Sequence, residues 1–145
     1  PNESIDEMLS NYFYPYDLVD LIKGYLDSGK ILDAGIILLD RDDFSVVGGH
    51  AVNIVGYCDY IATGDFGQRA ETTFYVYDNN YPHTLGKMII FIGKEQYRGA
   101  SHDSLNYTYI TPDEKYIAAS GSFNSLVVCD EDYNIINDLV PGWEN

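Results

Sequence analysis

Basic residues are scarce in this chain, which has 8 Lys and Arg against 23 Asp and Glu, for a formal net charge of −15. Such a surface repels phosphate groups, so neither nucleic acid nor a membrane surface is expected as a partner. No apolar stretch approaches the roughly 20 residues that span a bilayer, and no signal peptide is visible. There is no Gly-rich phosphate-binding motif, so no nucleotide cofactor is expected. The acidic surface suits an extracellular or cell-surface protein, or one with a cationic partner.

Cysteine and histidine are also rare. The only cysteines, Cys58 and Cys129, permit one disulfide but do not define a redox compartment. Of the three histidines, His83 and His102 have no neighbour at metal-ligand spacing, which argues against a zinc site. We therefore expect no metal and no organic cofactor, and the third histidine, His50, needs a different explanation.

Length and composition predict one globular domain, because the chain has 145 residues of which 46% are hydrophobic and 21% are charged. The apolar periodicity predicts an α+β fold in which N-terminal helices pack on a mainly antiparallel sheet. Helices are expected at 4–13, with a capping box, and at 17–28, with Gly29 as its left-handed end. Residues 1–93 form a helix-plus-sheet region in this interpretation, and 94–145 add strands of unknown role. The expected strands are 34–40, 50–62, 72–77, 87–93, 106–110, 115–120 and 125–130, with a loop at 41–49 and turns at 63–71 and 78–86.

His50 opens the alternating run "HAVNIVGYCDYIA" (50–62) and follows two glycines, Gly48 and Gly49. Side chains alternate along a strand, so His50 shares a face with Val52 and Ile54. The glycines remove side-chain bulk beside the imidazole, which suits a histidine at the rim of a cleft. An ordinary strand-end histidine bonded to backbone is the alternative.

Asp78 is the expected partner of that histidine. If the strands 50–62 and 72–77 pair as a hairpin, the start of the first lies near the end of the second, where Asp78 stands. A carboxylate beside an imidazole fixes its tautomer and stabilises the imidazolium, and an oriented base is what nucleophilic catalysis requires. The alternative for "DNNYP" (78–82) is a plain turn rich in Asp and Asn.

The stretch from the second helix to Gly93 resembles the C-terminal half of papain-like cysteine peptidases, and most of all the relatives of bacteriocin-processing peptidases. The blocks are, in order, "IKGYLDSGK", "AGIILLD", "GGHAVNIVGY", "FYVYDNNYP" and "GKMIIFIG", and they cover about half of the chain. In that family the histidine of the "GHAV…VGY" block is the general base, and the Asn or Asp after the next strand orients it. The resemblance therefore implies that His50 is the base and Asp78 the orienting residue, with Asn79 in reserve.

The family's nucleophilic cysteine and its oxyanion-hole glutamine lie upstream of the histidine, and no cysteine precedes His50 here. The family's Asn-Ser-Trp is also absent, so Asp78 is assigned by strand position. Cys58 is eight residues along the same strand, about 26 Å away, and is expected to be a small buried hydrophobe. A catalytic role for Cys129 is the less favoured interpretation. Since the chain starts at Pro1 without Met, we expect that the Cys-bearing half lies upstream or on another chain; an inactive relative is the alternative.

The resulting prediction is a cysteine peptidase-like domain that hydrolyses a peptide or protein substrate by acyl transfer, with a nucleophile from outside this chain. The alternative is an inactive module that binds a protein or a glycan. The acidic loop 40–43 is solvated in the simplest interpretation, but its position before His50 would also favour basic substrate side chains. Asp130, Asp132 and Asn134 have the opening spacing of a calcium loop but lack its glycine and glutamate, which favours a turn.

Overall fold

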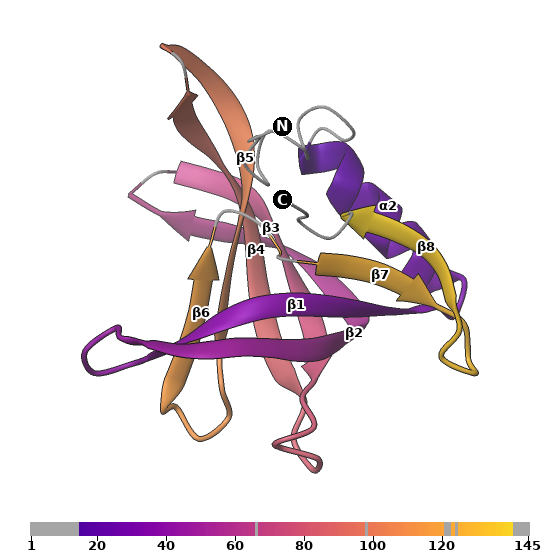
Figure 1. Ribbon diagram of the computed structural model, residues 1–145. Helices are drawn as coiled ribbons and strands as arrows, with labels where there is room; N and C mark the ends of the chain where they lie inside the picture. The colour runs from indigo at the N-terminus through magenta and orange to yellow at the C-terminus, as the bar shows by residue number, and fades with distance from the viewer. Residues whose placement is uncertain (1–14, 66, 98, 121–122, 124, 141–145) are drawn as a thin grey trace.

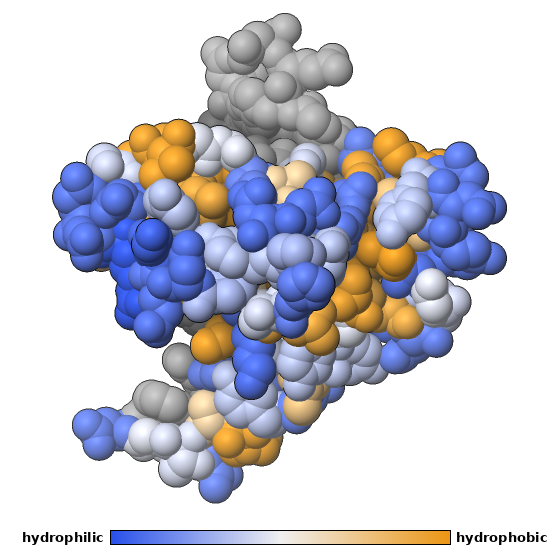
Figure 2. Space-filling model, turned by 90° about the horizontal axis from the view of Figure 1, so that it is seen from below, coloured by the Kyte–Doolittle hydropathy of each residue, from blue (hydrophilic) through white to orange (hydrophobic). Residues whose placement is uncertain are grey.

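The protein is described from a computed structural model that defines residues 15–65, 67–97, 99–120, 123 and 125–140. The helix expected at 4–13 lies outside these residues. Within them, no helix has the length and apolar character needed to cross a membrane. The surface seen from below is largely polar, with apolar side chains in several separate groups (Figure 2).

The α+β prediction is wrong, because the described part of the chain is one antiparallel sheet of eight strands with a single helix (Figure 1). The elements are α2 (Pro15–Asp27), β1 (Ile31–Asp40), β2 (Val46–Gly64), β3 (Gly67–Tyr77), β4 (Gly86–Tyr97), β5 (Ala100–Ile110), β6 (Tyr116–Ser120), β7 (Ser125–Cys129) and β8 (Ile135–Val140).

Two segments that were expected to be turns or polar connections are strand instead. The β2–β3 hairpin continues until Gly64 pairs with Gly67, and β4–β5 until Tyr97 pairs with Ala100. Most side chains near the β2–β3 tip are exposed, so they lack the apolar alternation by which a half-buried strand is recognised. The expected loop 41–49 is also too long, since residues 46–49 already pair with β1. None of the expected strands covers β8.

The sheet closes on itself. Its strand order is β2-β3-β4-β5-β6-β1-β7-β8, and β1 pairs with β2 as well. Strand β1 achieves this by changing neighbours along its length: Leu39 and Asp40 pair with β6, whereas residues 31–35 pair with β7. The first six strands in this order therefore form a closed ring, and β7 and β8 extend it from one end of β1.

The core lies inside this ring, where alternate residues of each strand meet. Fully or almost fully buried side chains include Leu32, Ala34, Ile36, Val52, Ile54, Phe74, Val76, Met88, Ile90, Leu105, Tyr107 and Tyr109. Helix α2 packs against β1, β2 and β5 and buries Leu18 and Ile22. As expected, this helix ends at a left-handed glycine, Gly29, with φ of 84°.

Candidate active site

His50 is the fifth residue of β2 and pairs with Ile36 of β1. Its side chain shares the inner face of the sheet with Val52 and Ile54, which are buried, but it remains 17% exposed. A Cβ added at Gly48 or Gly49 would meet no atom within 4 Å. The imidazole therefore lies at an accessible margin of the core, and there is open space beside Gly48 and Gly49.

Asp78 follows the last residue of β3 and is completely buried. Tyr77 pairs with Asn53 of β2. Asp78, which follows Tyr77, is therefore directed to the inner face and lies two positions along β2 from His50. The Nε2 atom of His50 lies 2.8 Å from Oδ1 of Asp78. The contact expected from the hairpin is present.

Two further donors complete the coordination of the Asp78 carboxylate. The backbone N–H of Asn80 donates to Oδ1 at 3.0 Å, and the hydroxyl of Tyr109 donates to Oδ2 at 2.8 Å. A buried carboxylate is tolerated only when it is hydrogen-bonded in this way. Both oxygens are fixed, so the plane of the carboxylate is fixed as well.

This geometry selects the tautomer of His50. With Nε2 directed at an acceptor, the proton of the neutral ring resides on Nε2 and the lone pair on Nδ1. Nδ1 forms no hydrogen bond with the residues that the structure describes. The arrangement is chemically that of an oriented base, in which Nδ1 accepts a proton and Asp78 stabilises the resulting imidazolium.

Tyr109 is a part of the site that sequence reasoning missed. It lies on β5, pairs with Met88 of β4 and is fully buried. Burial, together with the neighbouring Asp78 carboxylate, holds the pKa of Tyr109 far above its usual range. The hydroxyl therefore keeps its proton and remains a donor. The alternation of Leu105, Tyr107 and Tyr109 marks an inward-facing strand, and a buried tyrosine hydroxyl needs a partner, but only the closed sheet identifies that partner.

Asn79, the reserve candidate, is not part of this arrangement. It is exposed and lines a cavity of about 350 Å³ together with Asp33, Asn53, Tyr77 and Tyr133, among others. Asn53 donates a hydrogen bond from Nδ2 to Oδ1 of Asp33 across the β1–β2 pair. His50 is not among the residues that line this cavity, so Asn79 and His50 belong to different surfaces.

Neither cysteine is placed to act with His50. Cys58 is exposed, which corrects the expectation of a buried hydrophobe, and Cys129 is buried; both are free. Cys129 pairs with Ile31 while His50 pairs with Ile36, a separation of about 16 Å along β1 at ~3.3 Å per residue. Burial also raises the pKa of the Cys129 thiol, which keeps it in the unreactive protonated form.

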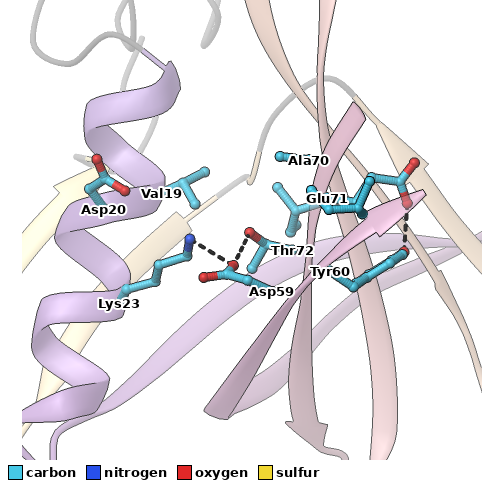
Figure 3. Close-up of a pocket in the computed structure, with 10 residues that line it drawn as sticks. Val19, Asp20, Lys23, Asp59, Tyr60, Ala70, Glu71 and Thr72 are labelled. Carbon is cyan, nitrogen blue, oxygen red and sulfur yellow. Dashed lines mark hydrogen bonds and ion pairs between the residues drawn. The ribbon is translucent and has the colours of Figure 1, made fainter. Parts of the chain in front are cut away.

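A second cavity, of about 380 Å³, lies between α2 and the β2–β3 hairpin (Figure 3). Lys23 forms an ion pair with Asp59 at 2.8 Å, and this contact lowers the pKa of the Asp59 carboxyl. Thr72 also donates to Asp59, and Tyr60 donates to Glu71 (Figure 3). Lys23 and Asp59 of this cavity are thus paired with each other, and His50 is not among its lining residues.

The other acidic segments form turns. Oδ1 of Asp130 accepts the backbone N–H groups of Asp132 and Asn134, both at 2.9 Å, between β7 and β8. Oδ1 of Asp40 similarly accepts the N–H of Asp42 at 2.8 Å in the β1–β2 turn. Among the described residues, no three His, Cys, Asp or Glu side chains are grouped to hold a metal ion.

Comparisons with protein-family models, curated proteins and solved structures found no match for this chain. The site is therefore interpreted from its own geometry.

Proposed function

We propose that this chain provides the general-base part of a papain-like cysteine peptidase site, and that the nucleophilic thiol comes from a polypeptide segment outside this sequence. The observation that carries the proposal is the contact of His50 Nε2 with the buried Asp78 carboxylate at 2.8 Å. It leaves Nδ1 as the basic atom of a side chain that is 17% exposed. The resemblance of the blocks around His50 and Asp78 to this family supports the same assignment.

In this mechanism, Nδ1 of His50 takes the proton of the incoming thiol, and the thiolate attacks the peptide carbonyl carbon. The imidazolium then gives that proton to the departing amine, which leaves an acyl group on the thiol. Nδ1 next removes a proton from water, whose oxygen attacks the acyl carbon and releases the carboxylate product and the thiol. Asp78 orients the imidazole and stabilises the imidazolium through its hydrogen bond with Nε2.

The test uses the complete natural polypeptide that contains these residues, together with its partner chain if the thiol is supplied by one. In His50→Gln, the side-chain amide keeps a donor for Asp78 but cannot act as a base. We expect hydrolysis of fluorescein-labelled casein to fall about 10²- to 10⁴-fold, and alkylation of the reactive thiol by iodoacetamide at neutral pH to slow as well. His83→Gln is the matched control, because His83 is exposed in the loop after β3.

Two results would refute the proposal. One is that His50→Gln hydrolyses casein at the rate of the unmodified protein, while its proposed catalytic thiol, followed separately from the exposed Cys58, also reacts with iodoacetamide at an unchanged rate. The other is that the complete assembly contains no cysteine besides Cys58 and Cys129, since neither of these reaches His50.

A non-catalytic module that binds a protein or a glycan is the second candidate, and the cavity beside Asn79 favours it. Tyr77 and Tyr133 are 36% and 67% exposed there, and Tyr133 has a left-handed backbone with φ of 63°. Exposed aromatic rings next to convergent polar groups are typical of ligand sites. Tyr133→Ala should abolish NMR shift changes caused by neutral oligosaccharides, whereas Phe44→Ala, at another exposed left-handed aromatic residue, should not. Absence of shift changes at millimolar oligosaccharide would exclude a glycan.

A further inference from the structure

We propose that Tyr109 is a positioning residue of the His50–Asp78 site, and that position 86 is glycine so that the Tyr109 ring can reach Asp78. The kinetic consequences of this inference rest on the proposed function. Its structural consequences, which are the tautomer and the orientation of His50, do not depend on the proposed function.

Within the described residues, Tyr109 is the single donor to one of the two carboxylate oxygens. Oδ1 of Asp78 receives His50 and the backbone N–H of Asn80, whereas among the described residues Oδ2 receives only the Tyr109 hydroxyl, at 2.8 Å. Without that hydroxyl, the carboxylate is free to turn about its terminal torsion, because such torsions are broad. Rotation moves Oδ1 away from Nε2 and releases the imidazole from its fixed orientation.

Gly86 provides the passage for the tyrosine ring. It pairs with Val76 of β3 and is buried between β3 and β5 in the strand order. A Cβ at this position would lie 2.7 Å from Cε1 of Tyr109 and 3.4 Å from its hydroxyl oxygen. Any side chain here therefore displaces the ring that bonds to Asp78. Four consecutive strands thus contribute to one arrangement: β2 the base, β3 the carboxylate, β4 the glycine and β5 the tyrosine.

The first experiment compares Tyr109→Phe with Tyr81→Phe in the complete polypeptide labelled with ¹⁵N-histidine. Tyr81 also donates to a carboxylate, that of Asp113 at 2.8 Å, but this contact is exposed. We expect the ¹⁵N signals of His50 to report one neutral tautomer, protonated on Nε2, in the unmodified protein and in Tyr81→Phe. Tyr109→Phe should instead show both tautomers. With casein as substrate, Tyr109→Phe should lower kcat about 10-fold and change KM less than about two-fold.

The second experiment tests the glycine. Gly86→Ala should reproduce the His50 signals and the kcat loss of Tyr109→Phe, whereas Gly24→Ala should change neither, since a Cβ at Gly24 meets no atom within 4 Å. The double variant Gly86→Ala with Tyr109→Phe should lose about 10-fold in kcat, no more than each single variant, because both act through one contact. A loss near 100-fold would show independent effects and overturn the link between the two positions.

The outcomes separate the two proposals. If Tyr109→Phe keeps one His50 tautomer and the original kcat, Tyr109 is not a positioning residue, whatever its effect on stability. If the unmodified protein does not hydrolyse casein but Tyr109→Phe still mixes the tautomers, the positioning role stands and the peptidase proposal fails. Should Gly86→Ala fail to fold, Tyr109→Phe decides alone, because it removes one hydroxyl group and keeps the ring.

Discussion

Replacement of Asp78 by alanine should destabilise the protein severely, because the carboxylate is fully buried and accepts three hydrogen bonds. The change leaves the Tyr109 hydroxyl and the His50 N–H without their acceptor. A buried donor that loses its partner costs about 1–3 kcal/mol, and this change leaves two such donors. We expect a loss of about 3–5 kcal/mol in the free energy of unfolding, or about 10 °C or more in Tm for a chain of this length.

Asp113→Ala is the matched control for this variant. Asp113 also accepts three hydrogen bonds, from the Tyr81 hydroxyl, the Thr111 hydroxyl and the backbone N–H of Lys115, but it is exposed. Water replaces its contacts, so its removal should cost roughly 1 kcal/mol or less. Urea unfolding measures both free energies. If Asp78→Ala and Asp113→Ala lower the free energy of unfolding equally, the burial of Asp78 does not strengthen its hydrogen bonds. The proposed importance of the buried carboxylate would then be wrong.

Three further predictions concern other parts of the molecule. Cys58 should react rapidly with iodoacetamide in the native protein and Cys129 only after unfolding, as mass spectrometry of the alkylated protein would show. Gly24→Ala should raise the free energy of unfolding by about 0.5–1 kcal/mol, because it adds a better helix former without a clash. The folded-state pKa of Asp59 is lowered, first by its hydrogen bond with Lys23 and less by Thr72. Its contribution to stability is therefore present above the unfolded pKa near 3.8 and is lost as pH falls through the folded value. Lys23→Met should make unfolding free energy less dependent on pH below about 4.

The central, half-buried parts of most strands and the His50–Asp78 contact were accessible to sequence reasoning because both follow from local rules. Alternation places Val52 and Ile54 on one face, and hairpin pairing brings the start of one strand to the end of the next. The helix beginning at Pro15 was likewise predictable from its apolar stripe and from Gly29 at its end.

The fold class and the role of Tyr109 depend on long-range pairing that the local pattern does not encode. Strand β1 pairs with β2, β6 and β7, and nothing in "AGIILLD" indicates three neighbours. Tyr109 contacts Asp78, which lies 31 positions earlier in the chain. Strand β4 lies between them, and in the sequence its Gly86 resembles an ordinary turn glycine. The long polar hairpins were missed because their residues lack a buried face and hence a period of two.

The role of Asp78 in preparing His50 is tested most directly by the ¹⁵N spectrum of the His50 imidazole at a pH where the ring is neutral. The exposed His83 of the same sample serves as an internal reference that samples both tautomers. We expect a hydrogen bound at Nε2 of His50 and a bare Nδ1. A spectrum with the hydrogen on Nδ1, or with the same mixture as His83, would contradict the claim that Asp78 prepares this ring to act as a base.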